Sequence, residues 1–201
     1  MTFLSGFLNH SQIQAFAAEG YLVIDQGLTV PELAAVQDEF ESLFELGQFK
    51  KAQVVSSKHK MVRGDWTYWL SEESPLHLRQ VYESLKSWQL PLNQNFYCGV
   101  THLEAHLAYY PEGLGYEKHW DQAFGRTERK VSFVLYLNSN WKNEHRGELI
   151  LYSPHSDKIL TEISPVGGRL VIFRSDLFPH EVKACLSPRR SLTGWFRSDA
   201  L

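Results

Sequence analysis

Two histidines, an aspartate and an arginine carry the most specific chemistry that this sequence suggests. His119 and Asp121 are separated by one residue, and His180 and Arg189 follow much later in the chain. Two imidazoles and one carboxylate are the donor set of the facial triad, which holds Fe(II) on one side and leaves adjacent positions open. An arginine offers a planar, two-pronged donor to a carboxylate. A metal beside a carboxylate anchor suggests an oxygenase that uses an α-keto acid.

Strands are the elements expected to position these ligands. If His119 and Asp121 lie on one strand, both side chains point to the same side and one short segment supplies two ligands. His180 follows Phe178-Pro179, which predicts a turn entering a strand at the rim of a barrel. An H-x-D pair is weak evidence taken alone, because a histidine beside an acid is more often a surface or buried hydrogen-bonded pair.

The strand predicted after His180 strengthens the case. Its period-two alternation gives two faces, with Arg189, Ser191, Thr193 and Trp195 on one and Arg190, Leu192, Gly194 and Phe196 on the other. If the first face points inward, a buried arginine lies near a hydroxyl, and a bound dicarboxylate would balance its charge. A salt bridge within the protein, or two arginines facing solvent, are the alternatives.

The predicted elements indicate an α+β fold. The first half of the sequence predicts mostly helices. A first helix would be capped by Asn9 or Ser11 and end at Gly20, and a second would begin at the capping box Thr29-x-x-Glu32. A third would begin at Ser74-Pro75 and end before Pro91. A strand is expected at 21–25. The second half reads as strands, at 102–110, 129–138, 147–153, 158–163, 169–173, 181–184 and 190–197. Many short strands separated by Gly, Pro and Asp turns favour a sandwich or a jelly-roll barrel.

Composition sets broad limits. The chain has 201 residues, 43% hydrophobic and 21% charged, with a net charge of −3, so nothing global attracts it to nucleic acid or to an anionic membrane. Cys98 and Cys185 lie far apart and outside any C-x-x-C pattern, which favours two buried thiols in a reducing compartment. The apolar start is too short to span a bilayer and has no basic region of a signal peptide. The cytoplasm is the expected location.

Two other groups of residues are candidates for function. The segment 47–65 carries five basic residues against one acid, and it reads either as a solvated loop or as a mobile lid over substrate. The cations of this segment are Lys50, Lys51, Lys58, Lys60 and Arg63. They would favour an acidic or polar peptide or tolerate a phosphate, and the nearby Trp66, Tyr68 and Trp69 could stack bases. His102, Glu104 and His106 share one strand face; they could chelate an ion, although such spacing more often gives a solvated stripe.

Several segments taken together resemble a known family. The segments are Tyr110–Asp121, Val131–Asn138, Gly168–Asp176, Pro179–Val182 and Arg63-Gly-Asp65. They resemble the 2-oxoglutarate/Fe(II) dioxygenases, most of all the oxygen-sensing prolyl hydroxylases of animals and their bacterial relatives. The resemblance covers roughly residues 60–200.

The resemblance implies a double-stranded β-helix, a cupin-like jelly-roll barrel, with N-terminal supporting helices. A single domain over 1–201 is expected, with helical support and a lid loop in 1–95 and the barrel with its catalytic site in 96–201. His119, Asp121 and His180 would bind Fe(II), and Arg189 would hold the C5 carboxylate of 2-oxoglutarate with help from the hydroxyl of Tyr136. O₂ is the second co-substrate and ascorbate a supporting reductant.

The resemblance also assigns the remaining site residues. Thr193 would lie beside the same carboxylate, Tyr110 near the keto-acid end and Trp195 close to the metal. Arg63 and Asp65 belong to the loop that covers the peptide in the similar prolyl hydroxylases. Without the resemblance, Tyr110 and Tyr136 would more readily be interpreted as plain amphipathic core residues. His106 could line the pocket.

The implied activity is hydroxylation of a prolyl residue in a protein, with release of succinate and CO₂. One alternative keeps this chemistry and changes the substrate to a nucleobase, a free amino acid or another small molecule. Another is a non-catalytic jelly-roll module that binds a metal or ligand; Arg189 and Tyr136 argue against it, since a simple metal binder needs no keto-acid anchor. A protein or peptide partner is expected, without nucleic acid or membrane. The target, a role in oxygen sensing and the oligomeric state are left open.

Overall fold

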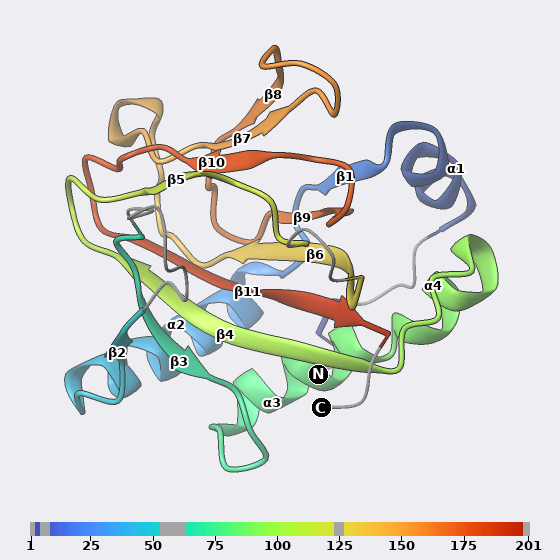
Figure 1. Ribbon diagram of the computed structural model, residues 1–201. Coiled ribbons are helices and arrows are strands. Elements are labelled where there is room, and N and C mark those ends of the chain that lie inside the picture. The colour runs from blue at the N-terminus through green and yellow to red at the C-terminus, as the bar shows by residue number, and fades with distance from the viewer. Residues whose placement is uncertain (1–2, 5–8, 53–62, 123–126, 199–201) are drawn as a thin grey trace.

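Two antiparallel sheets face each other, and helices cover the outer side of the larger one (Figure 1). The computed structural model describes residues 3–4, 9–52, 63–122 and 127–198. Over these residues the larger sheet has the strand order β1-β9-β6-β11-β4-β3-β2, and the smaller has the order β5-β10-β7-β8. This agrees with the expected α+β class and with a double-stranded β-helix.

The strands have the following bounds. The larger sheet contains β1 (Tyr21–Ile24), β2 (Lys50–Lys51), β3 (Trp66–Trp69), β4 (His102–Tyr110), β6 (Arg129–Tyr136), β9 (Leu170–Arg174) and β11 (Arg189–Arg197). The smaller sheet contains β5 (Tyr116–His119), β7 (Leu149–Tyr152), β8 (Ile159–Ile163) and β10 (His180–Val182). A short 3₁₀ helix, η1 (Asn143–His145), precedes β7.

The helices are α1 (His10–Glu19), α2 (Val30–Glu45), α3 (Leu76–Lys86) and α4 (Gln89–Phe96). The predicted boundary signals are present: Asn9 Oδ1 accepts from the Gln12 amide at 2.9 Å, and Gly20 ends α1 with a φ of 74°. The helix predicted to open at Ser74-Pro75 ends before Pro91, as expected, because α3 stops at Lys86; the sequence did not predict the separate helix α4, which begins at Gln89. Pro91 falls in its first turn, where no intrahelical N–H is needed.

Helix packing fixes the outer face of the larger sheet. Apolar side chains of α2 and α3 are fully buried against alternate residues of the central strands, and this cluster includes Val36, Phe40, Leu78, Val81, Leu107, Phe133, Leu192 and Phe196. The opposite faces of the same strands point between the two sheets, where Val134 and Tyr136 meet Leu149 and Phe173. The alternation predicted from the sequence therefore separates a structural face from a face that can carry a site.

The first half of the chain is mainly helical, as expected, but three strands from it extend the larger sheet. Strand β1 pairs with β9, and β3 pairs with β4. Trp66–Trp69 carried no strand prediction, since its pairing partner lies far away in the sequence. Among the described residues, no helix has the length and apolar character needed to cross a membrane.

Candidate active site

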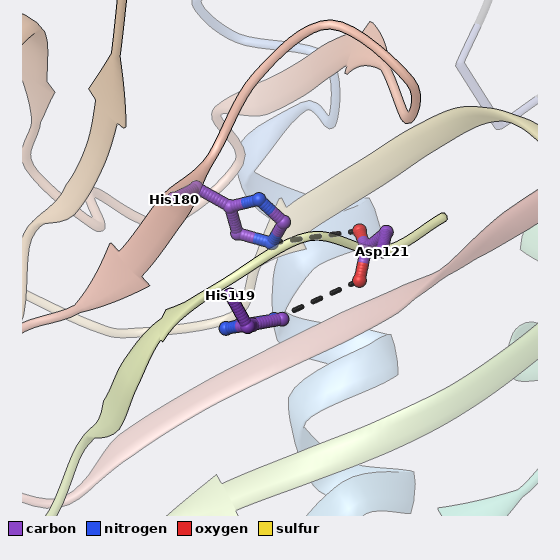
Figure 2. Close-up of side chains that lie close together, drawn as sticks. All are labelled: His119, Asp121 and His180. Carbon is purple, nitrogen blue, oxygen red and sulfur yellow. Dashed lines mark ion pairs between the residues drawn. The ribbon is translucent and has the colours of Figure 1, made fainter. Parts of the chain in front are cut away.

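The three predicted metal ligands come together at one end of the space between the sheets. His119 is the last residue of β5 and His180 the first of β10, and these two residues are direct partners in the antiparallel pair. Asp121 follows two residues after β5. One donor atom from each of the three side chains lies within 4.8 Å of the other two, and Figure 2 shows the two rings turned toward the carboxylate. Strand pairing thus closes the long sequence gap before His180.

Backbone carbonyls orient both imidazoles. His119 Nδ1 lies 2.7 Å from the Glu117 carbonyl and His180 Nδ1 lies 3.1 Å from the Phe178 carbonyl. Because a carbonyl only accepts, each Nδ1 carries the proton and each Nε2 presents a lone pair. The Nε2 atoms are 3.7 and 3.5 Å from the carboxylate oxygens of Asp121. Three acceptors therefore converge with no proton between them, which is an arrangement that a cation satisfies.

The charge states also suit a metal ion. Burial lowers the pKa of His180 to about 4, so the ring is neutral near pH 7. Burial alone raises the pKa of Asp121, but His180, His119 and a hydrogen bond from Ser132 outweigh it and hold the pKa well below its usual range. Neutral imidazoles and an ionised carboxylate are the states that coordinate a metal.

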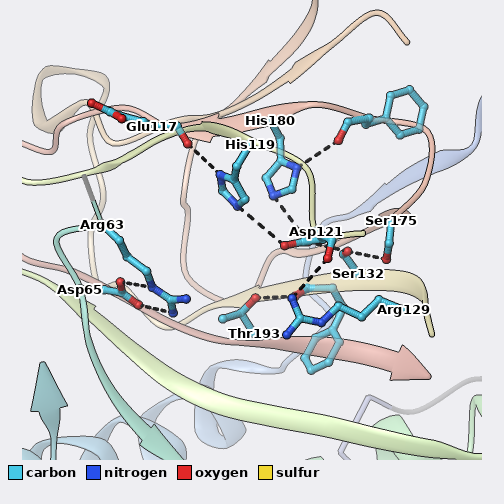
Figure 3. Close-up of polar contacts among 12 residues, drawn as sticks. Arg63, Asp65, Glu117, His119, Asp121, Arg129, Ser132, Ser175, His180 and Thr193 are labelled. Atoms are coloured by element: carbon cyan, nitrogen blue, oxygen red, sulfur yellow. Dashed lines mark hydrogen bonds and ion pairs between the residues drawn. The ribbon is translucent and has the colours of Figure 1, made fainter. Parts of the chain in front are cut away.

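The expectation that His119 and Asp121 share a strand is wrong. Strand β5 ends at His119, and Asp121 lies in a bend beyond it. Contacts from β6 hold Asp121 instead: Ser132 Oγ donates to its carboxylate at 2.6 Å, and Arg129 Nη1 donates to its backbone carbonyl at 3.3 Å. Figure 3 shows these contacts around the site. The structure brings Asp121 next to both imidazoles, although the geometry that positions it differs from the expected one.

Arg189 lies at the other end of the same space. It begins β11, and only 2% of its surface is exposed. Its Nε donates to the Gly147 carbonyl at 3.0 Å and its Nη1 to Ser191 Oγ at 3.4 Å. Among the described residues, no carboxylate forms an ion pair with it, which is costly for a buried cation. The neighbouring Arg190 faces the other way and pairs with Glu41 on α2, as the predicted alternation requires.

Two tyrosines flank this guanidinium. Arg189 Cζ is 5.0 Å from the ring centre of Tyr136 and 5.2 Å from that of Tyr110. Tyr136 is fully buried, and within the described part of the chain its Oη has no hydrogen-bond partner. Burial raises the pKa of both phenols, so both stay protonated. A small carboxylate would satisfy the guanidinium and the unpaired hydroxyl together.

The metal end and the Arg189 end line a single cavity of about 100 Å³. Thr193 and Trp195 also line it, as the face assignment predicts. Thr193 Oγ1 donates to the Phe133 carbonyl at 2.8 Å, so this hydroxyl can only accept from a ligand. Trp195 carries the Arg129 guanidinium 3.5 Å above its ring. It therefore reaches the metal end through Arg129, which contacts Asp121.

The predicted lid residues Arg63 and Asp65 form part of the cavity wall. Arg63 donates to both carboxylate oxygens of Asp65, at 2.6 and 2.9 Å, and Asp65 is fully buried. The middle of the basic segment, with Lys58 and Lys60, lies outside the described residues, so its closure over a substrate stays a prediction. The described part of the segment contributes a fixed ion pair to the site.

The other candidate metal ligands, His102, Glu104 and His106, do not form a metal site in the described part of the chain. Over the residues that the structure describes, the group able to hold a metal is the one around Asp121. Glu104 instead lies 2.9 Å from Arg197. His106 lines the cavity and packs between Trp69 and Trp195, with ring centres at 4.6 and 5.6 Å.

The sequence reading missed several residues that position the site. Ser132, Ser191 and Arg129 contact predicted site residues directly, and Gly147 supplies the carbonyl that orients Arg189. Gly147 has a φ of 75°, and a Cβ there would lie 2.9 Å from the Cys185 side chain. Only Ser191 had a signal, since it shares the predicted face with Arg189.

Comparison with known proteins agrees with this geometry. A family model described as the 2OG-Fe(II) oxygenase superfamily matches residues 105–197. Egl nine homolog 1 of Mus musculus is 29% identical over 188 residues, which cover 88% of this chain and 46% of that protein. The chain thus spans about half the length of this curated relative.

Two solved structures are similar over nearly their whole length. A prolyl-4-hydroxylase from Pseudomonas putida has a TM-score of 0.84 at 29% identity, covering 94% of this chain and 97% of that one. A prolyl hydroxylase from Trichoplax adhaerens, solved with a hypoxia-inducible factor oxygen degradation domain peptide fragment, has a TM-score of 0.83 at 27% identity. The match covers 92% of this chain and 87% of that one.

Proposed function

We propose that this chain is a 2OG-Fe(II) oxygenase that hydroxylates a prolyl residue of a protein substrate, as its similarity to that superfamily and to prolyl hydroxylases supports. The proposal rests on one observation: a single cavity has converging metal-ligand side chains at one end and a buried guanidinium without a described counter-ion at the other. The acceptor atoms of His119, Asp121 and His180 converge at one end, and at the other end the buried Arg189 has no carboxylate partner among the described residues. Fe(II) and 2-oxoglutarate together satisfy both ends.

His119, Asp121 and His180 would hold Fe(II), and Arg189 with Tyr136 would hold the far carboxylate of 2-oxoglutarate. Bound Fe(II) supplies the oxidation chemistry, in which 2-oxoglutarate and O₂ are converted to succinate and CO₂ and one oxygen atom enters a C–H bond. Ascorbate would help to keep the iron reduced.

The protein's own part is positioning and exclusion of water. The carbonyls of Glu117 and Phe178 keep both imidazoles in one tautomer. Ser132 holds the Asp121 carboxylate, and the Arg189 charge fixes the far end of the co-substrate. Apolar side chains between the two ends limit access of water, and they are Val134, Leu149, Phe173 and Val182.

The prolyl substrate is inferred from the similar proteins. The Pseudomonas putida and Trichoplax adhaerens structures are named as prolyl hydroxylases, and the second was solved with a peptide. The aromatic surface at the cavity fits a prolyl ring in an extended peptide: Trp195 lines the cavity, and Trp69 beside it is half exposed. We also propose a reducing, cytoplasmic setting, because Cys98 and Cys185 are both free thiols.

Mass spectrometry of a treated proteome tests the proposal. Cell lysate is incubated with the purified chain, Fe(II), 2-oxoglutarate and ascorbate, and peptides are searched for the mass of one added oxygen on proline. We expect new hydroxyproline with the wild-type chain and none with Asp121→Ala. Turnover of 2-oxoglutarate that oxidises only a nucleobase or a free amino acid would reassign the substrate. Absence of any turnover would remove the enzymatic proposal.

A further inference from the structure

A chain of two buried serine hydroxyls ends on the Asp121 carboxylate. Ser132, on β6, places its Oγ 2.6 Å from Asp121 Oδ2, and Ser175, directly after β9, places its Oγ 2.7 Å from Ser132 Oγ. Figure 3 shows the three side chains in a row. Ser132 is 2% exposed and Ser175 is fully buried, so water does not compete for these contacts.

The direction of this hydroxyl chain follows from its end. The contact at this end is a hydrogen bond from Ser132 Oγ to Asp121 Oδ2, and a carboxylate has no proton to donate, so Asp121 only accepts. Ser132 therefore donates its single hydroxyl proton to the hydrogen bond with Asp121. In the contact between the two serines, Ser175 is then the donor and Ser132 Oγ the acceptor. A hydrogen bond to a charged acceptor is roughly twice as strong as a neutral one.

Asp121 needs such a restraint because its strand does not provide one. Strand β5 ends at His119, so the register with β10 fixes His119 and not Asp121. Arg129 holds the Asp121 backbone carbonyl, and Gln122 returns a hydrogen bond to the Arg129 carbonyl. These contacts fix the backbone but leave the rotation of the carboxylate free.

We propose that Ser132 and Ser175 are positioning residues that lock the Asp121 carboxylate toward the two Nε2 atoms before a metal arrives. The inference rests on the metal site of the proposed function and adds the residues that preorganise it. Strand β6 pairs with β9 through Val131 and Arg174, and the Ser175 amide donates to the Lys130 carbonyl at 3.1 Å, so backbone pairing fixes the positions of both serines. Partners that orient a ligand in this way typically contribute to metal affinity.

An isosteric pair of variants tests the role of the Ser132 hydroxyl. Ser132→Val and Ser132→Thr have similar volume and differ in the hydroxyl alone. The metal-free full chain is titrated with Mn(II), and free Mn(II) is followed by electron paramagnetic resonance, which needs no turnover. We expect Ser132→Val to weaken Mn(II) binding by about 10- to 100-fold and Ser132→Thr to restore most of the wild-type affinity.

Ser175→Ala measures the distant end of the hydroxyl chain. It should weaken Mn(II) binding by about 2- to 10-fold, the effect of one neutral hydrogen bond. Ser74→Ala is the matched control, because Ser74 is also buried and accepts a hydrogen bond from the Ser71 amide, whereas Ser175 is the one that contacts Ser132. Its affinity for Mn(II) should equal that of the wild type.

The outcomes separate the two proposals. A wild-type chain that does not bind Mn(II) overturns the proposed function and this inference with it. If the wild type binds Mn(II) and folded Ser132→Val binds as tightly, only the inference falls. If Ser132→Val does not fold by circular dichroism, Ser175→Ala decides alone, and unchanged affinity there overturns the inference.

Discussion

The two ends of the cavity are built on opposite principles. At the proposed metal end, protein partners already orient every proposed ligand: carbonyls hold both imidazoles, and Ser132 holds Asp121. At the anchor end, Gly147 and Ser191 orient Arg189, but over the described residues its charge has no counter-ion and the Tyr136 hydroxyl has no partner. The metal end is thus preorganised in geometry, whereas the anchor end holds polar groups that only a ligand completes. Damage to the first should abolish turnover, and damage to the second should mainly change affinity.

The largest expected effect is at the metal end. Asp121→Ala removes one of three ligands, and succinate production from 2-oxoglutarate should fall by more than about 100-fold, beyond the loss typical of a supporting residue. Asp157→Ala is the control, since this exposed acid pairs with Lys118 at the surface, and it should keep near wild-type turnover. Near-normal succinate production by purified Asp121→Ala would contradict the ligand assignment.

Arg189→Ala should weaken binding of 2-oxoglutarate without affecting binding of the metal. Loss of a charged hydrogen bond costs about 1.5–3 kcal/mol, so KM for 2-oxoglutarate should rise by roughly 10- to 150-fold, while the affinity for Mn(II) stays unchanged. Arg190→Ala is a matched control, because the adjacent guanidinium faces α2 and pairs with Glu41. Equal KM values in the two variants would show that the buried charge is not the anchor.

Tyr136→Phe should have a smaller effect at the same end. Removal of one hydroxyl should raise KM for 2-oxoglutarate by about 2- to 10-fold. The ligand-free protein should not lose stability, because the deleted hydroxyl is buried and unpaired in the described structure. A clear drop in the melting temperature of the ligand-free variant, measured by calorimetry, would mean that the hydroxyl has a protein partner after all.

The last prediction concerns the stability of the fold rather than turnover or binding, at the wall between the ends where His106 lies. Burial lowers the pKa of His106 from 6.5 to about 3. When the pH falls from about 7 to about 5, the unfolded chain binds a proton at this residue and the folded chain does not, so acid destabilises the fold. Relative to His106→Gln, the wild type should lose on the order of 1–2 kcal/mol of unfolding free energy over this range. The measurement is a denaturant titration of both proteins at both pH values. If the unfolding free energies of the wild type and His106→Gln fall equally between the two pH values, His106 is not the residue responsible.

The sequence predicted the structure best where a local pattern, such as strand alternation or helix capping, determines it. Alternation along β11 correctly turned Arg189 inward and Arg190 outward, and cap residues such as Asn9 and Gly20 marked the limits of α1. A local pattern cannot show pairing between distant segments, so β3 was missed. It also cannot show that β5 stops at His119, because the contacts that hold Asp121 come from β6.

The supporting residues left almost no trace in the sequence. Ser132 lies in the apolar strand β6 and Ser175 directly after β9, and neither position marks a serine as functional in the sequence; their importance follows only from the distances to each other and to Asp121. The same holds for Gly147, whose carbonyl reaches Arg189 across a gap of many residues. Ligands could be predicted because their residue types are restricted by chemistry; the groups that orient them are not restricted in this way.

A crystal structure of the full chain, grown without oxygen in the presence of Mn(II) and 2-oxoglutarate, tests the central claim most directly. The account predicts Mn(II) bound to Nε2 of His119, Nε2 of His180 and a carboxylate oxygen of Asp121. The far carboxylate of 2-oxoglutarate should lie on Arg189 and the Tyr136 hydroxyl. A metal bound elsewhere, or a co-substrate whose far carboxylate does not reach Arg189, would contradict it.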